Sequence, residues 1–206
     1  YLVSQFLFLY HNIRTDQWGG SPENRRKFVL EVYKSMRKNT SPDFPISIKL
    51  NSADFQKGGF TEEESLDTIR ELSKAGIDLI EISGGTYEAP AMTGVKMKES
   101  TKVREAYFLD FADKARKISD VPLAVTGGFI SAEGIAQAIS TNATDFAGIA
   151  RSLAIEPDLP NKFLRGEKAL YPIKPIKTGI PMVDKMGIME VSFYTGQLER
   201  IGKGKN

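Results

Sequence analysis

The sequence predicts an α/β fold in which parallel strands alternate with helices. Short apolar runs of strand length recur along the chain, and amphipathic segments with helix-capping residues lie between them. This alternation is typical of parallel strands covered by helices. Glycines follow the last two runs, in "TGG" at 126–128 and "GIAR" at 148–151. Glycine lets a backbone approach a bound anion closely, so these two strand ends are candidate binding positions.

Capping residues locate the helices. Ser21 followed by proline is an N-cap with a first helical residue, and it predicts a helix over 22–38. Thr61 with Glu64 three residues later is a capping-box pattern, which predicts a helix over 62–75 that stops at a glycine. Two further helices are expected, over 106–118 and after Ser131.

The apolar runs predict four strands, over 44–50, 77–83, 121–128 and 145–150. Four successive βα units suit a doubly wound sheet or part of a (β/α)8 TIM barrel. A Rossmann fold would carry G-x-G-x-x-G after its first strand, and that motif is absent here. A TIM barrel instead commonly binds phosphate at the loops after its last two strands. The glycines of this chain lie at those positions, and this favours the barrel. Because a complete barrel needs about 250 residues, we expect a partial barrel with about the last four βα units in residues 1–170, followed by a tail over 171–206.

Composition excludes several classes of protein and of site. The chain has 206 residues, 41% apolar and 26% charged, with 28 Lys and Arg interspersed among 26 Asp and Glu. This pattern does not predict binding to nucleic acid. Cysteine is absent, so neither a disulfide nor a thiolate metal site is possible, and no metal site is expected. The apolar opening is too short to cross a membrane and is not a good signal peptide. The absence of cysteine makes the reducing cytoplasm the expected location.

Five blocks of the sequence resemble, in order, those of the Old Yellow Enzyme family of FMN-dependent NADH:flavin oxidoreductases. The blocks run from residue 1 to about 162, and "SFYTGQLERIGKGK" is similar to the final helix of some members. They are "YLVSQFL…NIRTDQWGGSPENRRKF", "FPISIKLNSADFQKGGFTEEES", "AGIDLIEISGG", "VPLAVTGGF" and "GIARSLAIEPDLPNK".

The resemblance implies roles for individual residues. Tyr1 matches the family's proton donor, and Lys49 matches a basic residue, usually Arg, that lies against the N1 and O2 edge of the flavin. Lysine keeps the charge of arginine without its planar fork. Tyr87 is a candidate for contact with substrate. The FMN phosphate site matches four residues that follow the last two strands: Gly127, Gly128, Ala150 and Arg151.

The implied activity is an ene-reductase reaction. NADH or NADPH reduces FMN, and flavin N5 then gives a hydride to the β-carbon of an activated alkene or a quinone-like acceptor. Tyrosine protonates the α-carbon in the same step. The resemblance also implies that Ala150, where the family usually has glycine, keeps its amide available if the local dihedral angles suit a Cβ.

Other interpretations stay open at this point. Lys49 could be a solvated side chain at a strand end, and the glycines and Arg151 could be turn residues and a surface charge. The chain could be an incomplete FMN oxidoreductase, a non-catalytic half-barrel that self-associates through open edges or binds a partner, or a phosphate-binding barrel without flavin. His11 is read as structural or exposed. A buried ion-pair network, rather than chemistry, is expected of Arg14, Asp16 and residues 24–26.

Overall fold

The computed structural model describes residues 2–55, 58–84, 106–167, 178–180, 184 and 188–205. Four parallel strands form one sheet in the order β1-β2-β3-β4. The strands are β1 (Ser47–Asn51), β2 (Leu79–Ser83), β3 (Leu123–Thr126) and β4 (Phe146–Gly148). Each new strand is added beside the last, without the reversal of order that defines a doubly wound sheet. This progression confirms the predicted partial barrel.

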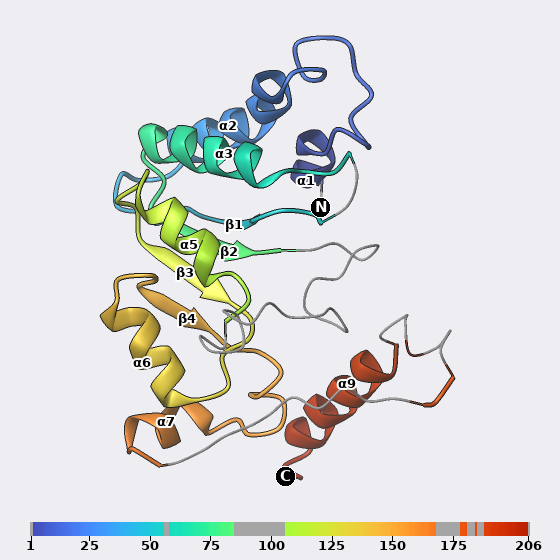
Figure 1. Cartoon of the computed structure of the whole chain (residues 1–206), viewed down its shortest axis with the longest axis vertical. Coiled ribbons are helices and arrows are strands. Elements are labelled where there is room, and N and C mark those ends of the chain that lie inside the picture. The colour runs from blue at the N-terminus through green and yellow to red at the C-terminus, as the bar shows by residue number, and fades with distance from the viewer. Residues whose placement is uncertain are drawn as a thin grey trace.

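Helices cover the sheet in the same order as the strands. Helices α2 and α3 lie beside the first strands, and α6 lies near β4 (Figure 1). The helices are α1 (Leu2–Leu7), α2 (Pro22–Lys38), α3 (Glu62–Ala75), α5 (Leu109–Arg116), α6 (Ala132–Ser140), α7 (Leu159–Leu164) and α9 (Ile188–Gly202). Among the residues that the structure describes, no helix is both long and apolar enough to cross a membrane.

The predicted capping interactions are present. The Ser21 side chain accepts a hydrogen bond from the Asn24 N–H, and Ser131 caps α6 in the same way. Thr61 and Glu64 form the complete capping box, in which each side chain accepts from the other residue's backbone N–H at 3.2 Å. Gly76 ends α3 with φ at +91°, a left-handed conformation that costs glycine little.

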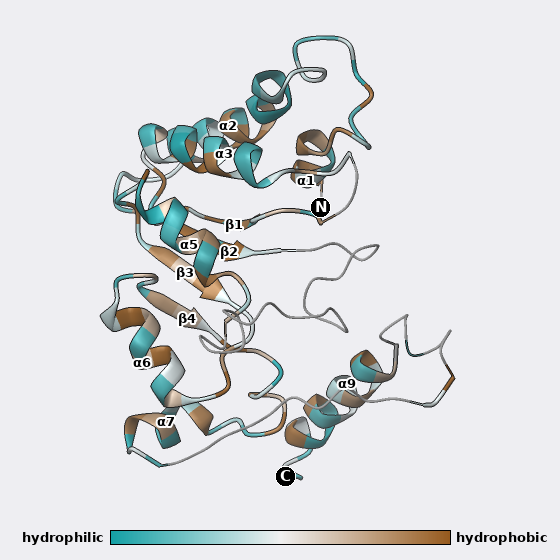
Figure 2. Cartoon of the chain, viewed as in Figure 1, coloured by the Kyte–Doolittle hydropathy of each residue, from teal (hydrophilic) through white to brown (hydrophobic). Residues whose placement is uncertain are grey.

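The core lies between the helices and one face of the sheet. Apolar side chains of β2 and β3 are completely buried there, together with residues of α3 and α5. The fully buried members include Ile69, Leu72, Ile80, Ile82, Leu123 and Val125. In Figure 2 the strands are largely hydrophobic, whereas the helices carry both hydrophilic and hydrophobic residues.

Some element bounds differ from the sequence-based expectation. The helix expected over 106–118 is shorter at both ends, because a turn precedes Leu109 and another follows Arg116. Strand β3 ends at Thr126, where two glycines with positive φ leave the extended conformation. The short helices α1 and α7 were not predicted, since six residues are too few for a clear apolar period.

Candidate active site

The carboxyl ends of the four strands lie at one edge of the sheet, since the strands are parallel. Polar and small residues meet there in register: Asn51 is paired with Ser83, and Thr126 with Gly148. The Ser83 hydroxyl donates to Asn51 Oδ1 at 3.1 Å. The arrowheads in Figure 1 all point toward this edge. The ends of β3 and β4, which precede the predicted site residues Gly127 and Ala150, are therefore neighbours at this edge.

Lys49 lies on the face of the sheet opposite the helices, and it contacts the neighbouring strand. Its Nζ is 2.6 Å from Glu81 Oε1, and the two residues are direct partners in the β1–β2 register. The Thr126 hydroxyl on β3 donates to the same Glu81 oxygen at 2.7 Å. We call this row across three strands the Lys49–Glu81–Thr126 ladder. The side chain of Lys49 remains 54% exposed, so its ammonium group is accessible.

The ladder keeps Glu81 ionised. Burial raises the pKa of Glu81, but the hydrogen bonds from Lys49 and Thr126, with the Lys49 charge, lower it more. The resulting pKa lies below the ordinary value for glutamate. Sequence reasoning missed Glu81. A signal was present in the sequence, because a glutamate lies inside the apolar run "IDLIEIS". It alternates with the buried Ile80 and Ile82 and therefore points to the opposite face of the strand.

Gly127 and Gly128 follow β3 with φ at +111° and +96°, a region that side-chain-bearing residues avoid. The Gly127 N–H donates to the Gly148 carbonyl at 3.3 Å, which ties the ends of β3 and β4 together. A Cβ on Gly148 would lie 2.0 Å from the Thr126 Oγ1, so the strands approach too closely for any other residue. Glycine at these strand ends is therefore a geometric requirement.

Ala150 and Arg151 follow β4. The non-glycine residues with positive φ in the described part of the chain are Phe55 and Asn142, so Ala150 has dihedral angles that suit its Cβ. Arg151 has a partner that the sequence did not predict: its Nη1 lies 3.5 Å from Glu190 Oε2 on α9. Burial raises the pKa of Tyr194, one turn further along α9, while the charge of Arg151 opposes that rise. Helix α9 thus packs near the proposed phosphate contact.

Tyr1 and Tyr87 lie outside the described residues. Helix α1 begins directly after Tyr1, and the segment that follows this helix is bonded to the loop after β1, where the Tyr10 N–H donates to the Gly58 carbonyl at 3.0 Å. The exposed His11 lies beside Phe8 and Tyr10, with ring centroids 5.7 and 5.3 Å apart, in agreement with its structural interpretation.

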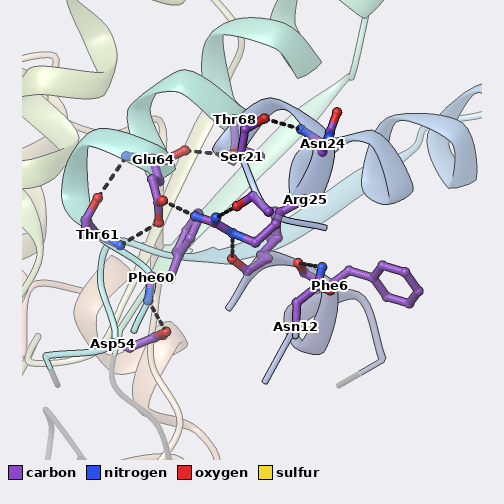
Figure 3. A network of polar contacts seen from close by, with 12 residues as sticks. Phe6, Asn12, Ser21, Asn24, Arg25, Asp54, Phe60, Thr61, Glu64 and Thr68 are labelled. Carbon is purple, nitrogen blue, oxygen red and sulfur yellow. Dashed lines mark hydrogen bonds and ion pairs between the residues drawn. The ribbon is translucent and has the colours of Figure 1, made fainter. Parts of the chain in front are cut away.

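A buried ion pair anchors this N-terminal segment (Figure 3). Arg25 is 3% exposed and pairs with Glu64 of α3. Its Nε donates to the Leu7 carbonyl at 3.0 Å, and its Nη1 donates to the Gly20 carbonyl. The predicted network is therefore confirmed at Arg25. It is wrong for Arg14 and Asp16, which pair with each other but are about half exposed because they lie in a surface turn.

Asp54 fixes the loop after β1. It is completely buried, and its Oδ2 accepts from the Phe60 N–H at 2.7 Å while Oδ1 accepts from the Asn51 amide at 3.2 Å. Burial raises the pKa of Asp54, and the two hydrogen bonds only partly offset that effect. The loop is held by neutral donors, which is a different environment from that of Glu81.

Comparison with known proteins gives a consistent assignment over most of the chain. The sequence profile of the NADH:flavin oxidoreductase / NADH oxidase family matches residues 1–169. NADH-dependent flavin oxidoreductase iliE of Hypocrea jecorina (strain QM6a) is 40% identical over 168 residues, covering 78% of this chain and 41% of that protein. NADH-dependent flavin oxidoreductase iccE of Talaromyces variabilis is 33% identical over 225 aligned positions, covering 98% of this chain and 53% of that protein.

Solved structures give the same fold. A 2-naphthoyl-CoA reductase in complex with 2-naphthoyl-CoA superposes with a TM-score of 0.72 at 32% identity, over 81% of this chain and 25% of that one. Morphinone reductase superposes with a TM-score of 0.63 at 25% identity, over 84% of this chain and 43% of that one. The chain spans about half, or less, of the length of the relatives that it matches.

Proposed function

Because the chain belongs to the NADH:flavin oxidoreductase / NADH oxidase family, and to its Old Yellow Enzyme-like members, we propose that it forms part of an FMN-dependent ene-reductase. The observation that carries the proposal is that Gly127, Gly128, Ala150 and Arg151 follow the neighbouring strands β3 and β4 of the sheet that also carries Lys49. Electrons come from NADH or NADPH, and the acceptor is an activated alkene or a quinone-like compound.

The residues present suit a flavin mononucleotide. Gly127 and Gly128 offer a backbone with positive φ for close approach to phosphate, and Arg151 offers a guanidinium group at the next strand end. Phosphate would compete with Glu190 for that group. Lys49 offers a positive charge on the open face of the sheet, for the ring.

Bound FMN would supply the two-electron transfer, and the protein would supply position, charge and a proton. Tyr1 would donate its phenolic proton to the α-carbon of the substrate, and Tyr87 would contact the substrate. Lys49 would favour negative charge on the ring edge. The four strands in the described part of the chain are half of the eight in a closed barrel. We therefore assign the full activity to an assembly in which this sheet is completed.

Flavin binding tests the proposal directly. FMN is titrated into the full chain while flavin fluorescence and absorbance are followed, and about one FMN per chain is expected. Arg151→Gln should weaken binding by about ten- to a hundredfold, since a charge-assisted contact is lost. Arg165→Gln is the matched control, because Arg165 is an exposed arginine with its own partners, Asp158 and Glu167. A chain that binds no FMN would favour the alternative, a non-catalytic half-barrel that self-associates or binds a partner.

The role of Tyr1 has a separate test. In an FMN-loaded preparation of that assembly, Tyr1→Phe should slow oxidation of the reduced flavin by an enone about 10²- to 10⁴-fold. Reduction of the flavin by NADH or NADPH should continue at its original rate. Stopped-flow absorbance separates the two half-reactions. Equal slowing of both would mean that Tyr1 is not the proton donor.

A further inference from the structure

The Lys49–Glu81–Thr126 ladder differs from the lysine–glutamate pairs that lie within single helices. Lys34–Glu31 and Lys74–Glu71 join residues three apart on one helix, and both lysines are more than 60% exposed. Such pairs contribute little to stability. The Lys49–Glu81 pair instead crosses from β1 to β2, and its carboxylate accepts from a second donor on β3.

Two donors on the same carboxylate oxygen restrict how Glu81 can move. The Thr126 hydroxyl at 2.7 Å fixes Oε1 from the β3 side, and the ammonium group at 2.6 Å approaches from the β1 side. Gly148 reinforces this arrangement, since it packs against the Thr126 side chain without space for a Cβ. The position of the ammonium group is therefore set by residues on three neighbouring strands.

We infer that Glu81 is a positioning residue for Lys49, and that Thr126 acts through Glu81. The inference rests on the proposed function only in assigning Lys49 to the flavin ring. Its consequence is that the ring would meet a cation that is already partly neutralised by a fixed carboxylate. Reduction adds negative charge to the ring, so loss of the Glu81 charge should favour the reduced form.

The first test needs no cofactor. Lys49 is acylated in the cofactor-free full chain with a limiting amount of amine-reactive ester, and the rate at each lysine is read by mass spectrometry. Glu81→Gln should raise the rate at Lys49 about fivefold, because the amine is released from its partner. Glu71→Gln is the matched control, and it should leave the rate at Lys49 unchanged. An unchanged rate at Lys49 in Glu81→Gln would overturn the inference, whether or not the chain binds FMN.

The second test uses the FMN-loaded protein. Glu81→Gln should bind reduced FMN about tenfold more tightly relative to oxidised FMN, which is a rise of about 30 mV for a two-electron couple. Thr126→Val should give a smaller rise, and Thr126→Ser, which keeps the hydroxyl, should restore the original potential. If Glu81→Gln lowers the melting temperature but leaves the reduction potential of FMN unchanged, Glu81 has a structural role only and does not position Lys49. Failure to bind FMN would contradict the proposed function and leave the acylation result to decide the inference.

Discussion

The two faces of the sheet are built from the same strands and have opposite characters. On the helix-covered face, Ile80, Ile82 and Val125 have no exposed surface. On the open face, Lys49 is 54% exposed and Phe146 is 56% exposed. The alternation follows from the period of two in a strand, which sends successive side chains to opposite faces.

Because of this difference, the residues of one strand that stabilise the core and those that could take part in chemistry lie on opposite faces of the sheet. In β2, Ile80 and Ile82 supply the apolar contacts, while Glu81 between them carries the charge. A residue can therefore change on the open face with little effect on the core. Substitutions on the two faces should give results of different size and kind.

The largest effect is expected from Ile82→Ala on the covered face. It leaves a cavity in a completely buried site, which typically costs about 2–5 kcal/mol in the free energy of unfolding. Urea denaturation measures the loss. Leu79→Ala in the same strand is the control, since Leu79 is only partly buried and should cost less. Equal losses at the two positions would mean that the open face is as tightly packed as the core.

A smaller effect is expected from Gly148→Ala, which tests a crowded position on the open face. The added methyl group would lie 2.0 Å from the Thr126 Oγ1, and such overpacking costs about 1–3 kcal/mol. Thermal unfolding measures the cost. Gly196→Ala is the control, because no atom lies within 4 Å of its added Cβ and alanine is the better helix former. A neutral Gly148→Ala would show that the strand ends can separate at little cost.

The sequence predicted the covered face better than the open one. Capping residues such as Ser21 and Thr61, and the apolar strands, act through neighbours a few residues away, so their effects are readable along the chain. Lys49 was singled out by the resemblance, which matches it to a basic residue at a strand end. Its partner Glu81 lies 32 residues further on, and only the register of β1 against β2 brings the two together.

The contact between Arg151 and Glu190 could not be predicted from the sequence either. The two residues are 39 positions apart, and the helix that carries Glu190 gives no sequence signal of where it packs. Asp54 was missed for another reason. Nothing in "NSADFQKGGF" distinguishes an aspartate that accepts backbone hydrogen bonds in a buried loop from one in solvent.

The smallest expected effect is a difference in pH dependence between Glu81 on the open face and buried Asp54. The lowered pKa of Glu81 means that its contribution to stability is present above about pH 4.3, the unfolded value, and is lost as pH falls through the folded pKa. The raised pKa of Asp54 has the opposite sign. Its contribution is present below about pH 3.9 and is lost as pH rises through the folded pKa.

Urea denaturation of the unsubstituted chain, Glu81→Gln and Asp54→Asn across this acidic range measures both effects. Relative to Glu81→Gln, the unsubstituted chain should gain stability as pH rises, since ionised Glu81 is held by Lys49 and Thr126. Relative to Asp54→Asn it should lose stability over the same range, since desolvation disfavours the Asp54 carboxylate more than its amide donors favour it. Slopes of the same sign would mean that the ladder does not compensate Glu81 for its burial, and that the two carboxylates share one environment despite their different partners.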